Sequence, residues 1–311
     1  MQQGDLLSQF IHYLAPHSEV FARVKACAPW GIKEGKQDVC AFTYVLNGPC
    51  YLLVQGHPVR QLKPGQLLLL AKGTAHSVAS SPDASCEDVD SLFGNKTRQQ
   101  IEQMVLGGCG EPTEILCGYI RFPSHNLQLP DLFTATLPEI LILDAPADCR
   151  LGQLLRWIHA ENAQEQPGQA LVMEKLLQVL LVEILRALGQ FELNPGLLRA
   201  MHDRHLAPAL LAFVSNVAHQ WQLDELAAIA ALSRSAFTRR FRCLTGQSCQ
   251  TFIRHWRCLK AADMLSASQV SVRSIAEQCG FQSSDVFIRN FRQYSGLPPQ
   301  QFRTSFVAHV V

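Results

Sequence analysis

Hydrophobic residues are spaced in two different ways along the chain. Between residues 40 and 80 they form short apolar runs, which predict β-strands where turn residues bound them. The turn signals in this stretch are Asn47-Gly48, Gly56, Pro64-Gly65 and Gly73. After about residue 147 leucines recur every three or four positions, which is the spacing of an amphipathic helix. We therefore predict an α+β protein in which a small β-barrel is followed by helices.

Glycine and proline also mark the expected boundaries. The predicted domains are a barrel at 1–147, a helical extension at 148–190, a linker at 191–204 and an all-α domain at 205–311. The linker contains Asn194-Pro195-Gly196, and the extension contains the leucine stripe "LLQVLLVEILRAL" at 176–188. One part of this stripe can cover the barrel while another part forms a partner face. Gln178, Glu183 and Arg186 interrupt it, so we expect neither a bilayer span nor a membrane partner.

The C-terminal third contains a repeat displaced by 50 residues. "RRFRCLTG" at 239–246 and "RNFRQYSG" at 289–296 share the skeleton Arg-x-Phe-Arg-x-x-x-Gly, and matched sequence precedes both. Each copy has two phenylalanines on one helix face, namely Phe237 and Phe241, then Phe287 and Phe291. A short helix, a tight turn and this second helix form a helix-turn-helix motif. The repeat therefore predicts two such motifs.

Polar side chains dominate the opposite face of each second helix. The faces carry Arg234, Ser235, Thr238 and Arg239 in the first copy, and Ser284, Asp285, Ile288 and Arg289 in the second. Hydrogen-bonding groups in the first half of such a helix can read the major groove of DNA. Ser233 and either Ser283 or Ser284 are the expected N-caps. Asp285 either accepts a hydrogen bond from a cytosine amino group or caps its helix.

A predicted helix at 248–268 connects the two copies, because its apolar residues follow a helical period. About 20 residues of helix span about 30 Å. Successive major-groove faces on one side of B-DNA lie about 34 Å apart. The connecting helix thus places two recognition helices about one turn of DNA apart.

The charge distribution supports the same division. The net charge is only +1, yet residues 1–204 hold 16 basic against 21 acidic side chains and residues 205–311 hold 11 against 5. Ten of those eleven cations are arginine. An arginine-rich third joined to an acidic remainder indicates a module for polyanions attached to one with a different role.

Several short motifs in the second copy are specific enough to suggest a family. They are Ile275-Ala276, Gly280-Phe281, Phe287-Ile288-Arg289-Asn290-Phe291, Gly296-Leu297-Pro298-Pro299 and Phe302-Arg303. Residues 205–306, about a third of the chain, closely resemble the DNA-binding domain of AraC/XylS-type transcription regulators. Cys249 and Phe302 stand where that family more often has proline and tyrosine, away from the predicted groove faces.

The resemblance implies a sequence-specific DNA-binding transcription regulator. It implies promoter DNA and RNA polymerase as partners and the cytoplasm as location. The implied role is that of a transcription activator, with repression left open as the alternative. The family's base-contacting positions carry over to Ser235, Thr238 and Arg239, and to Ser284, Asp285, Ile288 and Arg289. Because regulators of this type often act as pairs, we expect a homodimer through the helical extension.

A second resemblance lies near the N-terminus. "PGQLLLLAKGTAH" at 64–76 is similar to the second cupin motif, with Gly65, Gly73 and His76 in register. AraC-type regulators commonly place a cupin sensor before the DNA-binding domain. The His-x-His pair of the first cupin motif is missing, which leaves too few ligands for a metal. We expect no metal or other cofactor and place His76 at a strand end or cavity wall.

Two hypotheses remain open for the signal. A small apolar or amphipathic effector in the barrel is the default for a cupin sensor. The alternative is a thiol switch at Cys27 or Cys86, the two most accessible-looking of the eleven cysteines. Acidic neighbours of Cys86 disfavour its thiolate. The chain has no C-x-x-C pair, and so many cysteines without one indicate a reducing compartment.

Two other function classes compete with a regulator. A cupin-type enzyme fused to a DNA-binding domain needs the metal ligands that this chain lacks. The chain also has no G-x-S-x-G, Walker, H-E-x-x-H or G-x-G-x-x-G motif, so we expect no enzyme and assign no catalytic residue. A purely architectural DNA binder leaves the N-terminal two thirds without a role.

Overall fold

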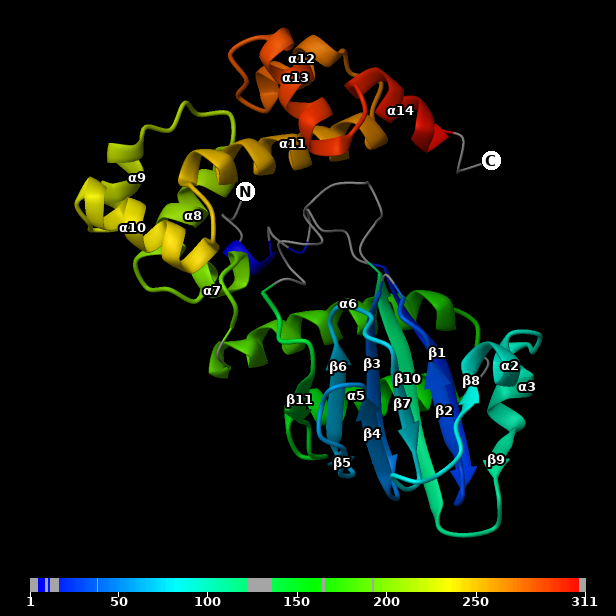
Figure 1. Ribbon diagram of the computed structural model, residues 1–311. Coiled ribbons are helices and arrows are strands. Elements are labelled where there is room, and N and C mark those ends of the chain that lie inside the picture. The colour runs from blue at the N-terminus through cyan, green and yellow to red at the C-terminus, as the bar shows by residue number, and fades with distance from the viewer. Residues whose placement is uncertain are drawn as a thin grey trace. The chain divides into compact units, whose positions relative to one another are not determined.

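The computed structural model describes residues 5–8, 11, 17–37, 39–121, 136–163, 166–191 and 193–307. These residues form two compact units. The sheet unit holds 17–121 and 137–191, and the helical unit holds 193–307 with Thr136 and the described residues before 16. Figure 1 shows strands and helices in the sheet unit, and helices throughout the described part of the helical unit.

Two β-sheets build the sheet unit. The six-stranded sheet has the order β11-β6-β3-β10-β1-β9 and the five-stranded sheet the order β5-β4-β7-β2-β8. The first contains β1 (His17–Cys27), β3 (Cys40–Asn47), β6 (Gln66–Leu70), β9 (Val105–Gly107), β10 (Pro112–Arg121) and β11 (Leu141–Asp144). The second contains β2 (Gly31–Glu34), β4 (Cys50–Val54), β5 (Arg60–Leu62), β7 (His76–Ala79) and β8 (Glu87–Asp88). Neighbouring strands are antiparallel except for β1 with β9 and β2 with β8.

Side chains from both sheets meet in one core. In β4 the residues Cys50, Leu52 and Val54 are buried and the two between them are partly exposed. This alternation follows from the two-residue period of a strand. Val45 of β3 and Val78 of β7 belong to the same cluster. Burying each such aliphatic side chain stabilises the fold by about 1.5–3 kcal/mol.

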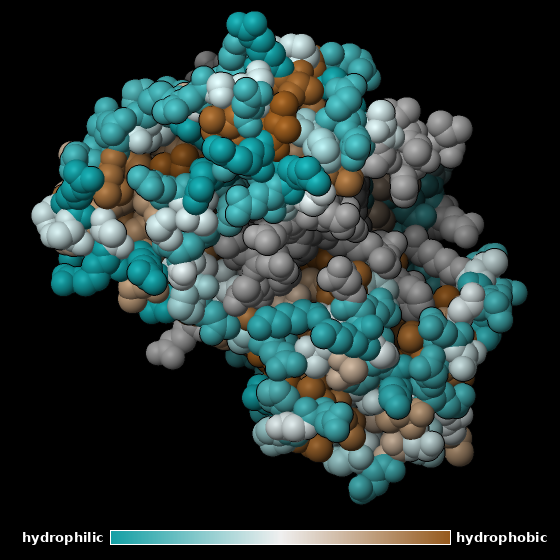
Figure 2. All heavy atoms as spheres, turned by 45° about the horizontal axis from the view of Figure 1, so that its top comes forward, coloured by the Kyte–Doolittle hydropathy of each residue, from teal (hydrophilic) through white to brown (hydrophobic). Residues whose placement is uncertain are grey.

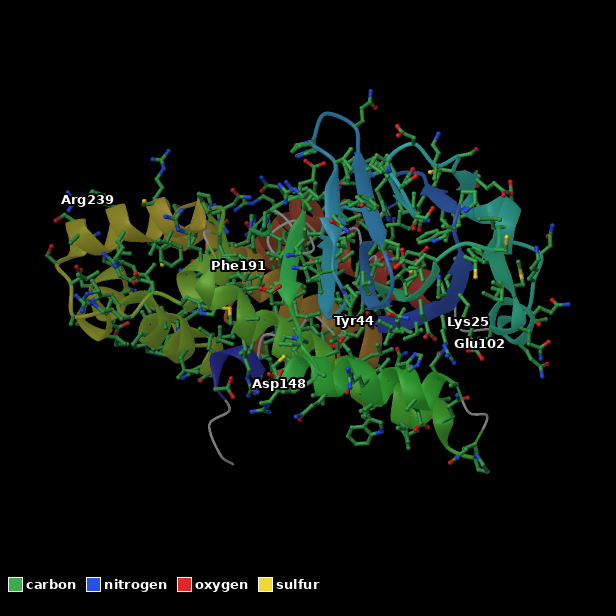
Figure 3. The ribbon with its side chains drawn as sticks, turned by 90° about the horizontal axis from the view of Figure 1, so that it is seen from below. Lys25, Tyr44, Glu102, Asp148, Phe191 and Arg239 are labelled. Carbon is green, nitrogen blue, oxygen red and sulfur yellow. The ribbon has the colours of Figure 1, made fainter. Side chains whose placement is uncertain are left out.

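Helices pack beside the six-stranded sheet. Helix α5 (Arg150–Asn162) and helix α6 (Gln169–Ala187) pack on each other and on β1, and Figure 3 shows them along one side of the strands. The four leucines of β6 are all buried, so both faces of that strand are covered, which explains its continuous apolar sequence. Shorter helices are α2 (Val89–Phe93), α3 (Arg98–Gln103) and the 3₁₀ turn η1 (Leu188–Gln190).

The predicted fold class is confirmed, although the described strands keep to two sheets and do not close into one hydrogen-bonded ring. The turn at Gly56 joins the paired strands β4 and β5. The signals at Asn47-Gly48, Pro64-Gly65 and Gly73 instead lie where the chain passes between sheets. A turn residue fixes a change of chain direction, whereas burial of each strand's apolar face decides its hydrogen-bonding partner.

Eight helices carry the described helical unit from residue 197 onward: α7 (Leu197–Met201), α8 (Leu206–Ser215), α9 (Leu223–Ile229), α10 (Arg234–Thr245), α11 (Cys249–Ala267), α12 (Val272–Gln278), α13 (Ser284–Ser295) and α14 (Pro299–Val307). Figure 1 shows α11 running from the helices around α10 to those around α13. Across all described residues, the helices are too short or too polar to cross a bilayer.

Helix α11 takes part in two aromatic cores. In its first half, the Phe252 ring lies 5.9 Å from that of Phe213 and 5.6 Å from that of Phe241. Its second half contributes Leu259 and Leu265 to a separate cluster with the aromatic side chains of α13 and α14. The same helix therefore anchors both helix-turn-helix motifs.

The range 191–204 contains helix α7. Leu197 and Leu198 are buried, and the N–H of Gly196 donates to the carbonyl oxygen of Leu244 at 2.8 Å. Helix α7 packs on α10. The second half of this range therefore contributes to the folding of the helical unit.

Asp203 ties the start of α8 to α10. Its Oδ1 accepts hydrogen bonds from the backbone N–H groups of His205 and Leu206 at 3.1 and 3.0 Å. The same oxygen accepts one from Arg240 Nε at 2.9 Å, and Arg240 also donates to Oδ2. Burial raises the pKa of Asp203, but the Arg240 guanidinium and the two N–H donors outweigh it, so the net pKa is lowered.

We predict that Arg240→Met lowers the free energy of unfolding by about 1 kcal/mol at neutral pH. Because folding lowers the pKa of Asp203 below its ordinary value of 3.8, the stabilisation is present above that value and disappears as pH falls through the folded pKa. Thermal unfolding of both proteins from neutral to acidic pH measures this effect. The difference in Tm should shrink in acid; a constant difference contradicts the assignment.

Candidate nucleic-acid interface and sensor cavity

Helices α10 and α13 begin and end in the same way. Ser233 Oγ accepts the N–H of Ala236 at 3.3 Å, and Ser283 Oγ accepts that of Val286 at the same distance. Each helix has twelve residues and ends at a glycine with positive φ. The predicted cap at Ser233 is confirmed, and of the two candidates in the second copy the cap is Ser283.

The repeated phenylalanines orient both helices. Phe237, Phe241, Phe287 and Phe291 are all at most 2% exposed. Because they lie four residues apart on one face of each helix, burying them turns the opposite face outward. The predicted amphipathic arrangement is thus present in both copies.

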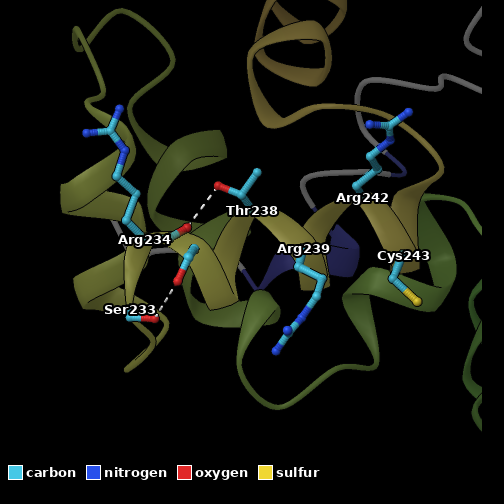
Figure 4. A pocket seen from close by; sticks show the side chains of 7 residues that line it. Ser233, Arg234, Thr238, Arg239, Arg242 and Cys243 are labelled. Atoms are coloured by element: carbon cyan, nitrogen blue, oxygen red, sulfur yellow. Dashed lines mark hydrogen bonds between the residues drawn. The ribbon is translucent and has the colours of Figure 1, made fainter.

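The outward face of α10 borders a hollow. It is lined by Ser233, Arg234, Ser235, Thr238, Arg239, Arg242 and Cys243. Thr238 Oγ1 donates to the carbonyl oxygen of Arg234 at 2.9 Å, and Ser233 and Ser235 share a hydrogen bond of 3.3 Å. Figure 4 shows Arg239 and Arg242 extending outward from the helix. The four α10 residues predicted from the sequence line this one surface.

The corresponding surface of α13 is lined by Asp285, Ile288, Arg289, Arg292, Gln293 and Gly296. Ile288 is 38% exposed, which leaves an apolar group on an otherwise polar face. Asp285 lies in the first turn, where a carboxylate interacts favourably with the helix dipole. Since Ser283 caps the helix, the capping role considered for Asp285 is excluded. Ser284 is the first residue of the helix and lies outside this lining.

Arg242 and Arg292 are not among the site residues predicted from the sequence. They occupy equivalent positions of the Arg-x-Phe-Arg skeleton and line equivalent hollows. The repeat could have identified both arginines, because each follows directly after a phenylalanine of the buried face and is therefore expected to be exposed. Figure 2 shows hydrophilic side chains over much of the visible surface of the helical unit, in agreement with its arginine content.

A separate cavity lies inside the sheet unit, and Glu34, His76 and Tyr119 are the ionisable oxygen and nitrogen groups of its lining. His76 Nε2 is 3.9 Å from Glu34 Oε2, and His76 Nδ1 donates to the carbonyl oxygen of Thr74 at 2.9 Å. The remaining lining residues are Val24, Ile32, Ala41, Phe42, Thr43, Val78, Val89, Phe93, Cys117 and Gly118. His76 therefore lies on a cavity wall at the start of β7, as predicted.

Low polarity around this cavity shifts several pKa values. Burial lowers the pKa of His76 against a smaller opposing effect of the Thr74 carbonyl and Glu34. Burial raises the pKa of Tyr119, and the Glu34 carboxylate raises it further. Burial also raises the pKa of Cys117 to about 12. The cavity thus favours neutral forms of these groups.

The two cysteines proposed as sensors lie outside the cavity lining. Cys27 is the last residue of β1, and Cys86 precedes β8 with its thiol 3.5 Å from the carbonyl oxygen of Ala84. Both are partly exposed, and Cys109, which is not one of the two predicted sensors, is more exposed. Among the described residues there is no cluster of three His, Cys, Asp or Glu side chains that could hold a metal.

Two family models match the chain. A model described as Cupin matches residues 5–190, more than half of the chain, and one described as Helix-turn-helix domain matches residues 226–305. An uncharacterized HTH-type transcriptional regulator of Haemophilus influenzae is 29% identical over 97% of this chain and 99% of its own. A putative AraC-like transcription regulator of Streptomyces lividans is 26% identical over 96% and 98%.

Among solved structures, the DNA-binding domain of AdpA in complex with a target DNA is similar to part of the chain. It is 33% identical, covers 34% of this chain and 96% of that domain, and has a TM-score of 0.34.

We predict that His76→Gln weakens the pH dependence of stability. Because burial lowers the pKa of His76 below its ordinary value of 6.5, stability is complete above that value and is lost as pH falls toward the folded pKa. Glutamine does not titrate, so Tm should fall less steeply between neutral and mildly acidic pH in the variant. Other histidines contribute equally to both proteins, and identical slopes would contradict the prediction.

Proposed function

We propose that α10 and α13 of this chain, which is an AraC-type transcription regulator, bind successive major-groove segments of promoter DNA. Its cupin domain covers residues 5–190, and its helix-turn-helix domain covers residues 226–305. The observation that carries the proposal is the pair of equivalent, outward-facing cationic surfaces on these helices. Helix α11 between them has 19 residues and therefore spans about 28 Å, close to the roughly 34 Å between groove faces.

The chemistry of each surface suggests its contacts. Arg239 and Arg289 suit bidentate hydrogen bonds to guanine, and Asp285 suits the amino group of cytosine. Ile288 suits the methyl group of thymine. Ser235, Thr238 and Ser284 suit further hydrogen bonds to base edges or phosphates. Arg234, whose NH1 lies 3.2 Å from Asp224 Oδ2, joins Arg242 and Arg292 as candidates for phosphate contacts.

The domain division belongs to the same proposal. Residues 1–147 form a cupin-like sensor, 148–190 a helical extension and 205–311 the DNA-binding domain. Of the predicted linker at 191–204, helix α7 packs on α10, so the linking segment is the part before this helix. The protein acts in the cytoplasm on RNA polymerase at promoters and performs no catalysis of its own. The relatives named above are transcription regulators, which supports this role over that of a cupin-type enzyme.

A second copy of the chain is the proposed partner of the helical extension. Trp157 of α5 and Leu171 and Val179 of α6 are 58%, 60% and 46% exposed. Leu171 and Val179 lie eight residues apart and thus on the same side of α6. Large exposed apolar side chains on paired helices are typical of a dimer surface.

The proposed signal is a small molecule in the cavity of the sheet unit. The cavity has a volume of only about 30 Å³, so its walls must move apart to admit an effector. The lining then offers apolar walls, with Glu34, His76 and Tyr119 as polar groups that orient a ligand. The cysteine hypothesis remains a second candidate, because Cys27 and Cys86 are partly exposed. In the effector hypothesis the groups that detect the signal line the cavity, whereas in the thiol-switch hypothesis they are cysteines outside its lining.

We predict that Arg239→Ala and Arg289→Ala each weaken specific DNA binding by about 1–3 kcal/mol. Each variant should lose preference at its own base positions, about one helical turn from those of the other. Titration of labelled duplexes, selected with the wild-type protein, measures affinity and salt dependence. Unchanged affinity and salt slope in both variants would exclude the proposed docking.

Arg273→Ala is the matched control. Arg273 is an arginine of α12 whose side chain is 82% exposed and pairs with Glu277 at 3.3 Å, and it lines neither hollow. Its replacement removes the same charge. It should leave the preference at every base position intact.

We further predict that Cys27→Ser and Cys86→Ser respond normally in a reporter strain, whereas Glu34→Gln loses its response. Glu34→Gln keeps the shape of the side chain but removes a charge facing the cavity, so DNA affinity should remain. Cells are tested with and without a mild oxidant. Loss of response in Cys27→Ser alone, at unchanged DNA affinity, would replace the effector by a thiol switch.

A further inference from the structure

Arg257 lies where the two cores of the helical unit meet. It belongs to α11, between Trp256, whose ring centroid lies 5.8 Å from that of Phe252, and Cys258, which belongs to the second cluster. Arg257 Nε donates to the carbonyl oxygen of Val217 at 3.1 Å, and its NH2 group donates to that of His219 at 2.7 Å. Both carbonyls belong to the loop at 216–222, which joins α8 to α9.

The 216–222 loop also contacts the second helix-turn-helix motif. Gln220 Nε2 donates to the carbonyl oxygen of Gly280 at 2.8 Å, and Gly280 lies in the turn between α12 and α13. A Cβ atom added to Gly280 would lie 2.7 Å from the carbonyl oxygen and 2.9 Å from the Cα of Ala218. The loop that leads into the first motif is therefore packed against the turn of the second.

The two copies of the repeat differ at this position. The equivalent of Gly280 is Ala231, which has a positive φ of 52° and is exposed. The turns are otherwise alike, because Ala231 and Gly280 each donate their N–H to a carbonyl three residues earlier at 3.0 Å. The turn geometry thus accepts an alanine in the first copy. In the second copy, close approach of the 216–222 loop leaves no room for one.

We propose that the 216–222 loop, held by Arg257 and packed on Gly280, is a brace that fixes α10 relative to α13 and so sets the one spacing at which two DNA elements are read. This inference rests on the proposed function. A braced pair loses less orientational freedom when the second helix docks, because its geometry already matches the bound state. Without the brace, α11 alone connects the two motifs and several spacings become accessible.

Selection from random duplexes, each long enough for two major-groove segments, tests the brace in the full-length protein. Sequencing the retained duplexes gives both recognised elements and the distribution of distances between them. Wild type should select two elements at a single spacing. Arg257→Met and Gly280→Ala should still select both elements but at several spacings, with affinity for the wild-type spacing reduced roughly tenfold.

Two further variants separate geometry from charge and from turn strain. Arg257→Lys keeps the positive charge but cannot donate to both carbonyls in the same planar arrangement, so it should also broaden the spacing. Ala231→Gly makes the reverse exchange in the exposed turn of the first motif and should keep the wild-type spacing. Thermal unfolding identifies any variant that fails to fold. If Gly280→Ala is unstable, the Arg257 variants still test the brace, because Arg257 lies outside both turns.

Each outcome separates the brace from the proposed function. If wild type selects no paired elements, the two-helix docking itself is wrong. If wild type selects pairs at many spacings, or if the Arg257 variants keep the single spacing, docking stands and the brace is wrong. Loss of the second element altogether in Arg257→Met also overturns the brace, because damage to the second motif then replaces a change in spacing.

Discussion

The helical unit depends on aromatic packing against α11. The Phe241 ring lies 5.6 Å from that of Phe252 in the first half of this helix, and Phe291 belongs to the cluster around its second half. An α-helix has a fixed rise per residue, so residues that stabilise the two cores also set the length of α11 that separates them. The exposed arginines of α10 and α13 take their positions from these buried phenylalanines.

Packing against α11 does not by itself fix the orientation of the two motifs relative to each other. Backbone carbonyls of a loop need hydrogen-bond donors where packing excludes water, as it does at the buried Val217. Arg257 supplies them to Val217 and His219, and a rigid guanidinium can serve both at once. A local requirement for hydrogen bonding thereby couples two motifs that are distant in the sequence.

The sheet unit uses burial for a different purpose. Its buried core surrounds a small cavity whose lining includes Glu34, His76 and Tyr119. Polar groups in such a place need partners, and His76 donates to the carbonyl oxygen of Thr74. The depressed pKa of His76 reflects the cost of charging its ring where it is buried.

The sequence by itself determined the helix-turn-helix repeat, its cap at Ser233, its buried phenylalanines and the outward Arg239 and Arg289, because these follow from periodicities within a dozen residues. It also indicated the strands and His76, but its turn residues could not show that three of the turn signals connect different sheets. Only the tertiary structure joined Glu34 of β2 and Tyr119 of β10 to His76 of β7, and brought Arg257 to the 216–222 loop. Those groups are far apart along the chain, and what brings them together is the burial of apolar faces, which no local pattern records.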